Sequence, residues 1–225
     1  MDYTPSGFGV FFDAKIKEIV TRRRSVAHKR VATVANGVEA KWIVTKATSP
    51  QKIKKFICVG RYESRKGLPE INDAIQKLKN ESCEFHFVGP LPSEIELDDS
   101  RVHYHGSISD PSELMELLSA CDVLLCPSYA EGMPTVILEA MARGLAIIAT
   151  DVGATSVMVN SANGILLDEC SSDKIASALT ALLHIPDEKL LSLKYESLNK
   201  VKQFSWNCIA KATLKLISQS LKNDR

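Results

Sequence analysis

The sequence lacks most of the features that place a chain in a specialised class of protein. No uninterrupted apolar run approaches the roughly 18 residues that a membrane-spanning helix needs. The N-terminal stretch MDYTPSGFGVFFD has no basic segment ahead of an apolar one, so it does not resemble a secretory signal. A net charge of only +1 gives no global field that would attract nucleic acid or a membrane. With 45% hydrophobic and 24% charged residues, the 225-residue chain is expected to be a folded cytoplasmic α/β protein.

Motifs for disulfides, metal ions and nucleophilic hydrolysis are missing as well. The six cysteines form no C-x-x-C pair, and Cys58, Cys83 and Cys126 lie in runs typical of buried strands, which favours reduced core residues. His103 and His105 would share one face of a strand, but no third ligand stands out, and we expect no metal site. No G-x-S-x-G motif follows a strand, which argues against a Ser-His-Asp hydrolase.

The first 50 residues differ in character from the rest of the chain. Residues 15–30 hold seven Lys or Arg against one Glu, which is typical of a solvated helix face; binding to anionic lipid head groups or RNA is the alternative interpretation. A short strand is expected at 31–35, followed by the turn signal Asn36-Gly37. The polar run 46–55, which contains a proline, fits a linker.

From residue 54 onward, apolar runs alternate with amphipathic segments. Strands are predicted at 54–59, 84–88, 101–105, 122–126, 145–149 and 164–167. Helices are predicted at 68–79, from 110 onward, and at 134–143, 172–183, 187–203 and 206–221. Asp110 and Pro111 fit the cap and first turn of the second helix. The alternation favours a doubly wound, Rossmann-like parallel sheet with extra C-terminal helices, and such sheets bind ligands at the carboxyl ends of their strands.

The loop after the first of these strands is rich in glycine and positive charge. It runs from Gly60 to Gly67 and reads GRYESRKG. Glycine lets a backbone approach a phosphate closely, while Arg61 and Lys66 can supply charge-assisted hydrogen bonds. Each such bond contributes about 1.5–3 kcal/mol when it is well formed. Taken alone, the loop is equally compatible with an ordinary basic surface loop.

A second loop, at 127–133, leads into a helix that opens near Pro134. The free N–H groups and the dipole of a helix N-terminus form an anion site, and Gly132 would keep its entrance open. Glu131 lies in the loop, and Glu139 lies one turn further down the helix. A carboxylate does not favour a phosphate, but it can accept two hydrogen bonds from a vicinal diol such as a ribose. The segment therefore suits a ligand with both phosphates and sugars.

The spacing Glu131-x7-Glu139, written EGMPTVILE, resembles the donor-site motif of retaining glycosyltransferases of the GT-B fold and is most similar to glycosyltransferase family 4. The resemblance extends from about residue 31 along an ordered set of shorter signatures. These are Asn36-Gly37-Val38, Gly60-Arg61, Lys66-Gly67, Phe87-Val88-Gly89, His105-Gly106, Ala120-Cys121-Asp122, Pro127-Ser128, Asn163-Gly164 and Phe204-Ser205-Trp206. An isolated Glu-x7-Glu would be weak evidence, whereas the ordered set is strong.

The resemblance implies a role for each residue of the site. Arg61, Lys66 and Glu131 are the expected catalytic residues, the two cations on the donor diphosphate and the carboxylate on the transferred sugar. Glu139 would bind the ribose hydroxyls. The remaining donor-binding positions would be Gly60, Gly132, Met133, Thr135 and Val136 near the phosphates and sugar, and Gly89, Gly106 and Ile108 near the base.

The resemblance also implies an activity. Such enzymes transfer a sugar from a UDP-, GDP- or ADP-sugar to a carbohydrate or lipid-linked acceptor, with retention at the anomeric carbon. They need no cofactor and no divalent metal, because Arg and Lys neutralise the leaving diphosphate; the sequence agrees, since it has no Asp-x-Asp metal motif. Peripheral contact with the cytoplasmic face of a membrane is a further expectation, which depends only on the basic cluster at Arg22–Arg24.

The chain departs from the family in length. Residues 1–50 are interpreted as the end or remnant of an acceptor-binding domain plus a linker, and 51–225 as the donor-binding domain. The acceptor side of the cleft would then come from a missing N-terminal domain or a partner chain. The alternatives are a non-catalytic module of the same fold that binds nucleotide sugars or a partner and, more weakly, a nucleotide-sugar epimerase. The intact set of Arg61, Lys66, Glu131 and Glu139 favours the transferase.

Overall fold

The computed structural model describes the chain in four stretches, which are residues 9–11, 17–18, 22 and 31–223. Most of the basic segment at 15–30 therefore lies outside the described residues, and so does the helix face predicted there. Arg22, which is described, pairs with Glu18 at 2.6 Å. Within the described stretches, no helix combines the length and the hydropathy that a membrane span requires.

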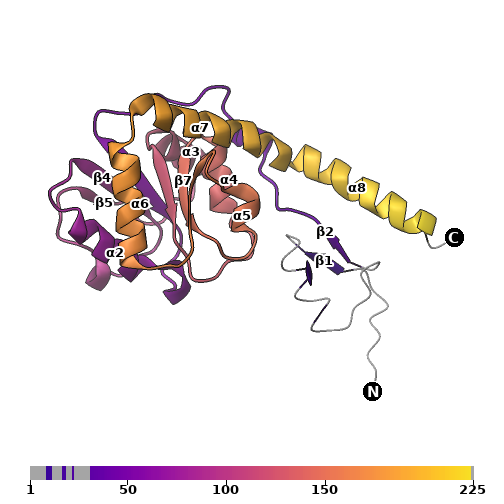
Figure 1. Ribbon diagram of the computed structural model, residues 1–225, viewed down its shortest axis with the longest axis horizontal. Helices are drawn as coiled ribbons and strands as arrows, with labels where there is room; N and C mark the ends of the chain where they lie inside the picture. The colour runs from indigo at the N-terminus through magenta and orange to yellow at the C-terminus, as the bar shows by residue number, and fades with distance from the viewer. Residues whose placement is uncertain (1–8, 12–16, 19–21, 23–30, 224–225) are drawn as a thin grey trace, which may run out of the picture.

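A parallel sheet of six strands, in the order β5-β4-β3-β6-β7-β8, forms the centre of the fold (Figure 1). The strands are β3 (Lys54–Val59), β4 (Cys83–Val88), β5 (Val102–Tyr104), β6 (Val123–Cys126), β7 (Ala146–Thr150) and β8 (Gly164–Leu167). Every neighbouring pair in this sheet is parallel. The doubly wound sheet predicted from the sequence is confirmed. A separate parallel pair, β1 (Gly9–Phe11) with β2 (Val31–Thr33), lies away from it.

Seven α-helices within residues 31–223 follow the strands or close the fold. They are α2 (Leu68–Lys77), α3 (Pro111–Ser119), α4 (Thr135–Ala142), α5 (Thr155–Met158), α6 (Ser172–His184), α7 (Asp187–Val201) and α8 (Trp206–Asn223). The cap predicted at the start of α3 is confirmed, since the Asp110 carboxylate accepts a hydrogen bond from the Ser112 N–H at 2.9 Å. Helix α8 projects away from the sheet (Figure 1).

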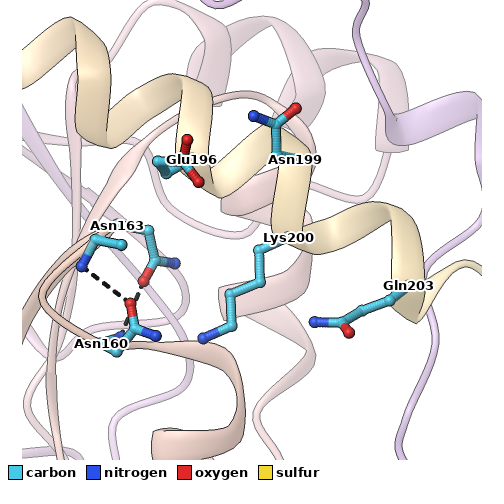
Figure 2. A pocket seen from close by; sticks show the side chains of 7 residues that line it. Asn160, Asn163, Glu196, Asn199, Lys200 and Gln203 are labelled. Atoms are coloured by element: carbon cyan, nitrogen blue, oxygen red, sulfur yellow. Dashed lines mark hydrogen bonds between the residues drawn. The ribbon is translucent and has the colours of Figure 1, made fainter.

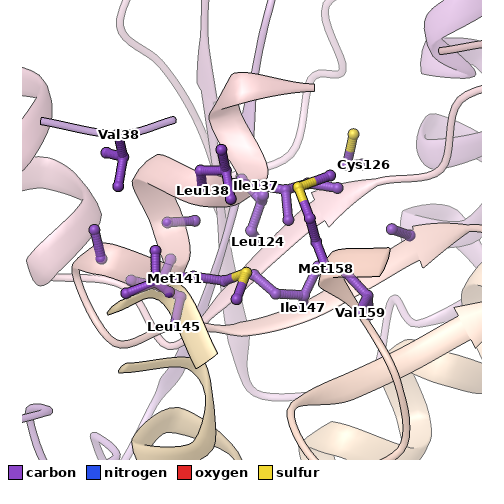
Figure 3. Packing of buried hydrophobic residues seen from close by; sticks show 14 of the residues in the cluster. Val38, Leu124, Cys126, Ile137, Leu138, Met141, Leu145, Ile147, Met158 and Val159 are labelled. Carbon is purple, nitrogen blue, oxygen red and sulfur yellow. The ribbon is translucent and has the colours of Figure 1, made fainter. Parts of the chain in front are cut away.

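Helices cover both faces of the sheet, because alternate residues of each strand point to opposite sides. On one face, α2 and α6 pack with Phe56 and Phe85 in a buried cluster. On the other face, α4 packs against β6 and β7, and Figure 3 shows Leu138 of α4 beside Leu124 of β6. Each large aliphatic side chain that is fully buried in this way stabilises the fold by about 1.5–3 kcal/mol.

The strand order creates one special position between β3 and β6. The chain runs outward from β3 through β4 to β5, then crosses back to β6 and runs outward the other way through β7 to β8. The loops that leave the carboxyl ends of β3 and β6 flank a narrow recess, the crevice, at the position where doubly wound sheets bind ligands. These are the two loops that the sequence singled out, at 60–67 and 127–133.

Residues 42–48, the entering segment, lead toward β3 and make more contacts with the sheet domain than a free linker would. Trp42 is 8% exposed and belongs to the core cluster on the α4 face. The Val44 N–H donates to the Ala142 carbonyl at 2.9 Å. Ala47 is buried, and a Cβ added to Gly144 would lie 3.1 Å from its side chain. Residues 48, 49 and 51–53 are exposed and lie outside helices and strands, as expected of a linker, whereas Ala47 is buried and Lys54 already begins β3.

A buried ion pair joins helix α7 to strand β6 and to the entering segment. The Lys194 ammonium donates to the Asp122 carboxylate at 2.8 Å and to the Thr48 hydroxyl at 3.1 Å. The second carboxylate oxygen of Asp122 accepts from the Lys55 N–H at 3.2 Å. Both side chains of the pair are almost inaccessible, at 0% and 1% exposed. Neither charge has access to water, so the fold depends on their staying together.

Substitution of Lys194 or Asp122 alone should therefore lower the stability of the fold. Lys194→Met is expected to lower the free energy of unfolding by about 3–5 kcal/mol, because it leaves the Asp122 charge buried without a counterion. Urea denaturation measures this difference. Lys189→Met, an exposed change on the same helix, is the matched control and should stay within about 0.5 kcal/mol of wild type. A loss below about 1 kcal/mol for Lys194→Met would contradict the assignment.

Candidate functional site

The Glu131 carboxylate lies where the two loops meet, beside the crevice, and three side chains donate to it. Lys66 Nζ lies 2.7 Å from Oε1, and the Ser128 hydroxyl donates to the same oxygen at 2.8 Å. Arg65 Nη1 donates to Oε2 at 3.1 Å. The Glu131 side chain is only 7% exposed. Burial by itself would raise the pKa of Glu131, but the hydrogen bonds from Lys66 and Ser128 and the charges of Lys66 and Arg65 lower it overall, so the carboxylate stays ionised.

Backbone contacts hold the two loops in this position. The Tyr129 N–H donates to the Arg65 carbonyl at 2.8 Å, and Arg65 Nη1 returns a bond to the Ala130 carbonyl at 3.1 Å. Gly67 has a φ of +69°, and a Cβ there would lie 2.5 Å from the Pro127 carbonyl oxygen. A side chain at Gly67 would thus push the loops apart. The cations and Glu131 are positioned by both loops together rather than by either one.

The far side of the second loop is fixed just as closely. The Ala154 N–H donates to the Gly132 carbonyl at 2.7 Å. Gly153 has a φ of +56°, and a Cβ there would lie 2.1 Å from the carbonyl oxygen of Glu131. The backbone of Glu131 and Gly132 therefore has no room to move toward β7. The side chain of Glu131 remains directed at the cations.

The N-terminus of α4 has no side-chain cap. The residue at the cap position is Pro134, which has no side-chain donor or acceptor and makes no cap hydrogen bond, and no other described side chain caps the helix. Thr135 and Gly132 are exposed, so solvent and ligands reach the first turn. Met133, by contrast, is 4% exposed, and its carbonyl accepts from the Asn36 amide at 3.2 Å. An anion at this terminus would meet free backbone N–H groups and the positive end of the helix dipole.

Glu139 is the second carboxylate of the pair, and its environment differs from that of Glu131. It lies in the middle of α4 and is half-buried. Burial raises its pKa above the ordinary value, and within the described chain no cation or hydrogen-bond donor offsets that effect. A carboxylate in this state has unfilled acceptor capacity. Hydroxyl groups of a ligand could fill it without competition from a salt bridge.

Arg61 and Lys66 both line a narrow recess at the end of β3. The Arg61 side chain is exposed and lies outside the ion-pair cluster, so it is available to an incoming anion. Cys58 and Cys126 line the same recess, and burial raises the pKa of these thiols to about 12 and about 11. Both thiols are therefore neutral at pH 7, which argues against a cysteine nucleophile here.

The three glycines predicted near the nucleotide lie side by side along the sheet. The Gly60 N–H donates to the Val88 carbonyl at 2.9 Å, and the Gly89 N–H donates to the Gly106 carbonyl at 2.8 Å. Gly89 has a φ of +140°, and a Cβ there would lie 1.9 Å from the Gly60 carbonyl oxygen. Nothing lies within 4 Å of the Cβ position of Gly106, so that side of the row is open. Ile108 follows on the same loop and packs partly against the core.

The structure brings most of the predicted residues to one edge of the sheet, but two members of the cluster were missed. Arg65 had been quoted only as part of the loop sequence, and Ser128 only as part of a signature. Both contact Glu131 directly. Arg65 is 66 residues from Glu131 along the chain, so no local pattern could pair them. The binding role of the whole set stays a prediction at this stage.

A separate hollow of about 350 Å³ lies elsewhere on the domain. Its polar lining residues, drawn in Figure 2, are Asn160, Asn163, Glu196, Asn199, Lys200 and Gln203. The first two precede β8, which places the hollow at the amino ends of the strands, opposite the crevice. It is larger than the recess beside Lys66, but it has neither a helix N-terminus nor a cluster of cations. We therefore place the candidate site at the crevice.

Taken together, the sheet topology, the two loops and the uncapped helix define an α/β domain of the kind that binds nucleotides. Comparison with known proteins identifies the class. The family model described as "Glycosyl transferases group 1" matches residues 53–184, which is more than half of the chain. The chain belongs to this family of glycosyltransferases.

Individual relatives agree with the family. The chain is 32% identical over 193 residues to the N,N'-diacetylbacillosaminyl-diphospho-undecaprenol alpha-1,3-N-acetylgalactosaminyltransferase of Campylobacter jejuni, a match that covers 82% of this chain and 50% of the relative. The chain thus spans about half the length of that protein. Among solved structures, sucrose-phosphate synthase from Thermosynechococcus elongatus matches with a TM-score of 0.78 at 22% identity, over 95% of this chain and 58% of that one. HepE of Anabaena, solved in complex with UDP-glucose, matches with a TM-score of 0.76 at 17% identity, over 95% and 64%. At these identities the structures show the shared fold, one half of a GT-B architecture.

The isolated carboxylate of Glu139 leads to a prediction about stability. Glu139→Gln is expected to raise the free energy of unfolding by up to about 1 kcal/mol at neutral pH, because it removes a charge that burial penalises. Because the folded pKa is raised, the penalty is complete only above that pKa and is absent below the ordinary carboxyl value. The advantage of the variant should therefore shrink as the pH falls toward about 4.

Thermal or urea unfolding as a function of pH measures this effect. Glu196→Gln, at an exposed mid-helix position, is the matched control and should show no such gain. A clear loss of stability in Glu139→Gln at pH 7 would show that the carboxylate has a partner that the apo geometry does not reveal.

Proposed function

We propose that this chain is the donor-binding half of a retaining glycosyltransferase that uses a UDP-, GDP- or ADP-sugar. The observation that carries the proposal is the cation cluster at the crevice, where Lys66 and Arg65 are held by a buried carboxylate beside an uncapped helix N-terminus. Family membership supports the reaction class. The complex of HepE with UDP-glucose supports the ligand class, since that protein shares the fold.

The cluster suits a diphosphate because its positive charge exceeds its negative charge. Lys66 and Arg65 are balanced by the carboxylates of Glu131 and Glu63, which binds Arg65 at 2.7 Å, and the excess positive charge is that of the exposed Arg61, which lines the same recess as Lys66. A nucleoside diphosphate would bind to Arg61, Lys66 and the first turn of α4. Glu131 would then be released from part of its ion pairing and could accept hydrogen bonds from the transferred sugar. Lys66 would thus exchange the Glu131 carboxylate for a phosphate when the donor binds.

Glu139 would bind the ribose, Gly60 would lie near the diphosphate, and Gly89 and Gly106 would face the base. Two hydroxyl donors would supply the partners that the half-buried Glu139 carboxylate lacks. Backbone groups of Gly132, Thr135 and Val136 would contact phosphate and sugar oxygens at the helix N-terminus. The base would then lie over the open side of Gly106 and near Ile108.

In the transfer itself, the bond between the anomeric carbon and the diphosphate oxygen breaks, and its electron pair stays on the phosphate. The acceptor hydroxyl forms the new bond on the same face of the sugar, and its proton passes to the departing phosphate oxygen. Arg61 and Lys66 lower the barrier by neutralising the charge that develops on this leaving group. Because two cations and a helix dipole already do this, we propose that the donor site uses no divalent metal.

The acceptor would bind to a surface that the sheet domain does not supply. Helix α8 projects from the domain, and Leu214 and Ile217 are exposed on it, which fits a helix that meets a second domain or a partner chain. We propose that the 225-residue chain alone binds the donor but transfers the sugar slowly. Single-turnover assays with and without an added acceptor domain would test this, and rapid transfer by the chain alone would contradict it.

Calorimetric titration with UDP, GDP and ADP tests donor binding directly. One of the three is expected to bind, and Lys66→Ala should weaken that binding by at least about tenfold, because a charge-assisted hydrogen bond of about 1.5–3 kcal/mol is lost. Lys77→Ala is the matched control, since Lys77 is another lysine in an ion pair but lies at the far end of α2. If no nucleotide binds, or if both variants lose affinity equally, the donor site is wrongly placed.

The two carboxylates should respond differently in the same titration. Glu139→Ala is expected to weaken binding of the nucleoside diphosphate more than Glu131→Ala, because Glu139 contacts the ribose and Glu131 contacts only the sugar. Glu131→Ala also frees Lys66 and Arg65 for the phosphates, so it is expected to leave the affinity for the diphosphate unchanged or higher. The reverse order would mean that the roles of the two carboxylates are exchanged.

A further inference from the structure

A second cluster of side chains that can bind a ligand lies on the sheet, away from the crevice. Strand β4 contributes Glu84 and His86, and the neighbouring strand β5 contributes His103. The parallel register sets His86 directly opposite His103. Because residues two apart share a face of a strand, Glu84 lies on the same side of the sheet, and so does His105, which follows β5.

The potential ligand atoms of this cluster converge. One atom from each of Glu84, His86 and His103 lies within 4.8 Å of the other two. The Glu84 oxygen Oε2 is 3.5 Å from His86 Nε2 and 4.0 Å from His103 Nε2. A tetrahedral zinc ion with bonds of about 2.0–2.1 Å keeps its ligand atoms about 3.3 Å apart. Small side-chain rotations would bring the three groups to that spacing.

The hydrogen bonding of His86 leaves one ring nitrogen without a partner. His86 Nδ1 lies 3.0 Å from His105 Nε2, so these two nitrogens share one hydrogen bond. Among the described residues, His86 Nε2 is buried and has no hydrogen-bond partner, although it lies 3.5 Å from the Glu84 carboxylate. When Nδ1–H donates to His105, the Nε2 lone pair points at a negatively charged oxygen, an arrangement that a bound cation would complete.

We infer that Glu84, His86 and His103 form a binding site for a divalent transition-metal ion of the zinc type, with His105 orienting the ring of His86. Two imidazoles and one carboxylate are ligands that favour such ions over magnesium or calcium, which prefer oxygen. The His103 side chain is 43% exposed, so the fourth coordination position would open to solvent.

This site is distinct from the proposed donor site. Its residues lie on the face of β4 and β5, whereas Lys66 and Glu131 lie at the carboxyl ends of β3 and β6. The metal would therefore take no part in neutralising the diphosphate. The sequence showed only the pair His103-x-His105, because the remaining ligands belong to a neighbouring strand that only the fold brings close.

Lys55 competes with a metal for the same carboxylate. Its ammonium lies 2.9 Å from Glu84 Oε2, and the side chain is 26% exposed, so it can turn outward when a metal binds. This competition predicts that removal of the Lys55 ammonium strengthens metal binding. Lys55→Met should bind the metal more tightly than wild type, because the carboxylate is then free and a like charge is removed. The backbone bonds that Lys55 makes with Asp122 do not depend on its side chain.

Calorimetry with zinc chloride on chelator-treated protein tests the site. A background of Cys208→Ser removes a thiol that is exposed in the structure and could bind zinc on its own. We expect one zinc ion per chain, with magnesium giving no heat. His103→Ala and the isosteric Glu84→Gln should each weaken zinc binding at least tenfold, and His105→Ala, which removes the orienting group, by about 10–100-fold.

His184→Ala is the matched control, because His184 and Glu81 form a histidine–glutamate pair at 3.2 Å that has no third metal-ligating side chain among the residues that the structure describes. It should leave the affinity unchanged, and circular dichroism on every variant confirms that it is folded. The proposal is overturned if wild type shows no saturable zinc binding, or if Lys55→Met and both ligand variants bind zinc as wild type does. A loss in His184→Ala equal to that in His103→Ala would overturn it as well.

Discussion

The buried carboxylate of Glu131 is the constraint on which the site depends. Removing a charged group from water is costly unless other charges and donors compensate for it. Here the compensation comes from Lys66 and Arg65 on one loop and Ser128 on the other. The loop after β3 and the loop after β6 must therefore lie together before either is stable in this form. An anionic ligand that replaces Glu131 as the partner of Lys66 would bind to positive charges that the fold has already brought together.

The backbone makes the same arrangement rigid. Gly67 and Gly153 leave no space between the loops and their neighbours, and Gly89 contacts the backbone of Gly60 closely. These contacts need glycine because a Cβ would overlap a carbonyl oxygen in each case. The backbone of Gly60 and Gly89 therefore lies near Lys66 and Arg65, at the position between β3 and β6 where the strand order of the sheet reverses. Doubly wound folds bind their ligands at this position, whatever the chemistry that follows.

Local signals in the sequence were enough to predict much of the fold. The apolar run at 145–149 predicted β7, and Asp110 followed by Pro111 predicted the start of α3; both are present. The two loops were also found from sequence, because glycine, charge and a helix start are all local features. What could not be predicted is how side chains pair across the fold. Arg65 with Glu131 is one such pairing, and His86 with His103 is another.

The entering segment illustrates the same limit. The run from residue 46 is polar and mostly exposed, as its composition indicated, but Ala47 within it is buried and Thr48 accepts a hydrogen bond from the buried Lys194. Tertiary packing decided the outcome, and only the structure contains that information. Lys194 of α7 also binds Asp122, next to β6, although the two residues are far apart in the sequence. The same ammonium therefore joins the core to the entering segment.

The central claim is that one crevice, between the loops after β3 and β6, binds the nucleotide. Backbone amide chemical shifts in the presence of UDP, GDP or ADP test it most directly. The account predicts shifts concentrated at 60–67 and 131–139, with smaller ones at Gly89 and Gly106. Shifts centred on the hollow beside Lys200, or none with any of the three nucleotides, would contradict it.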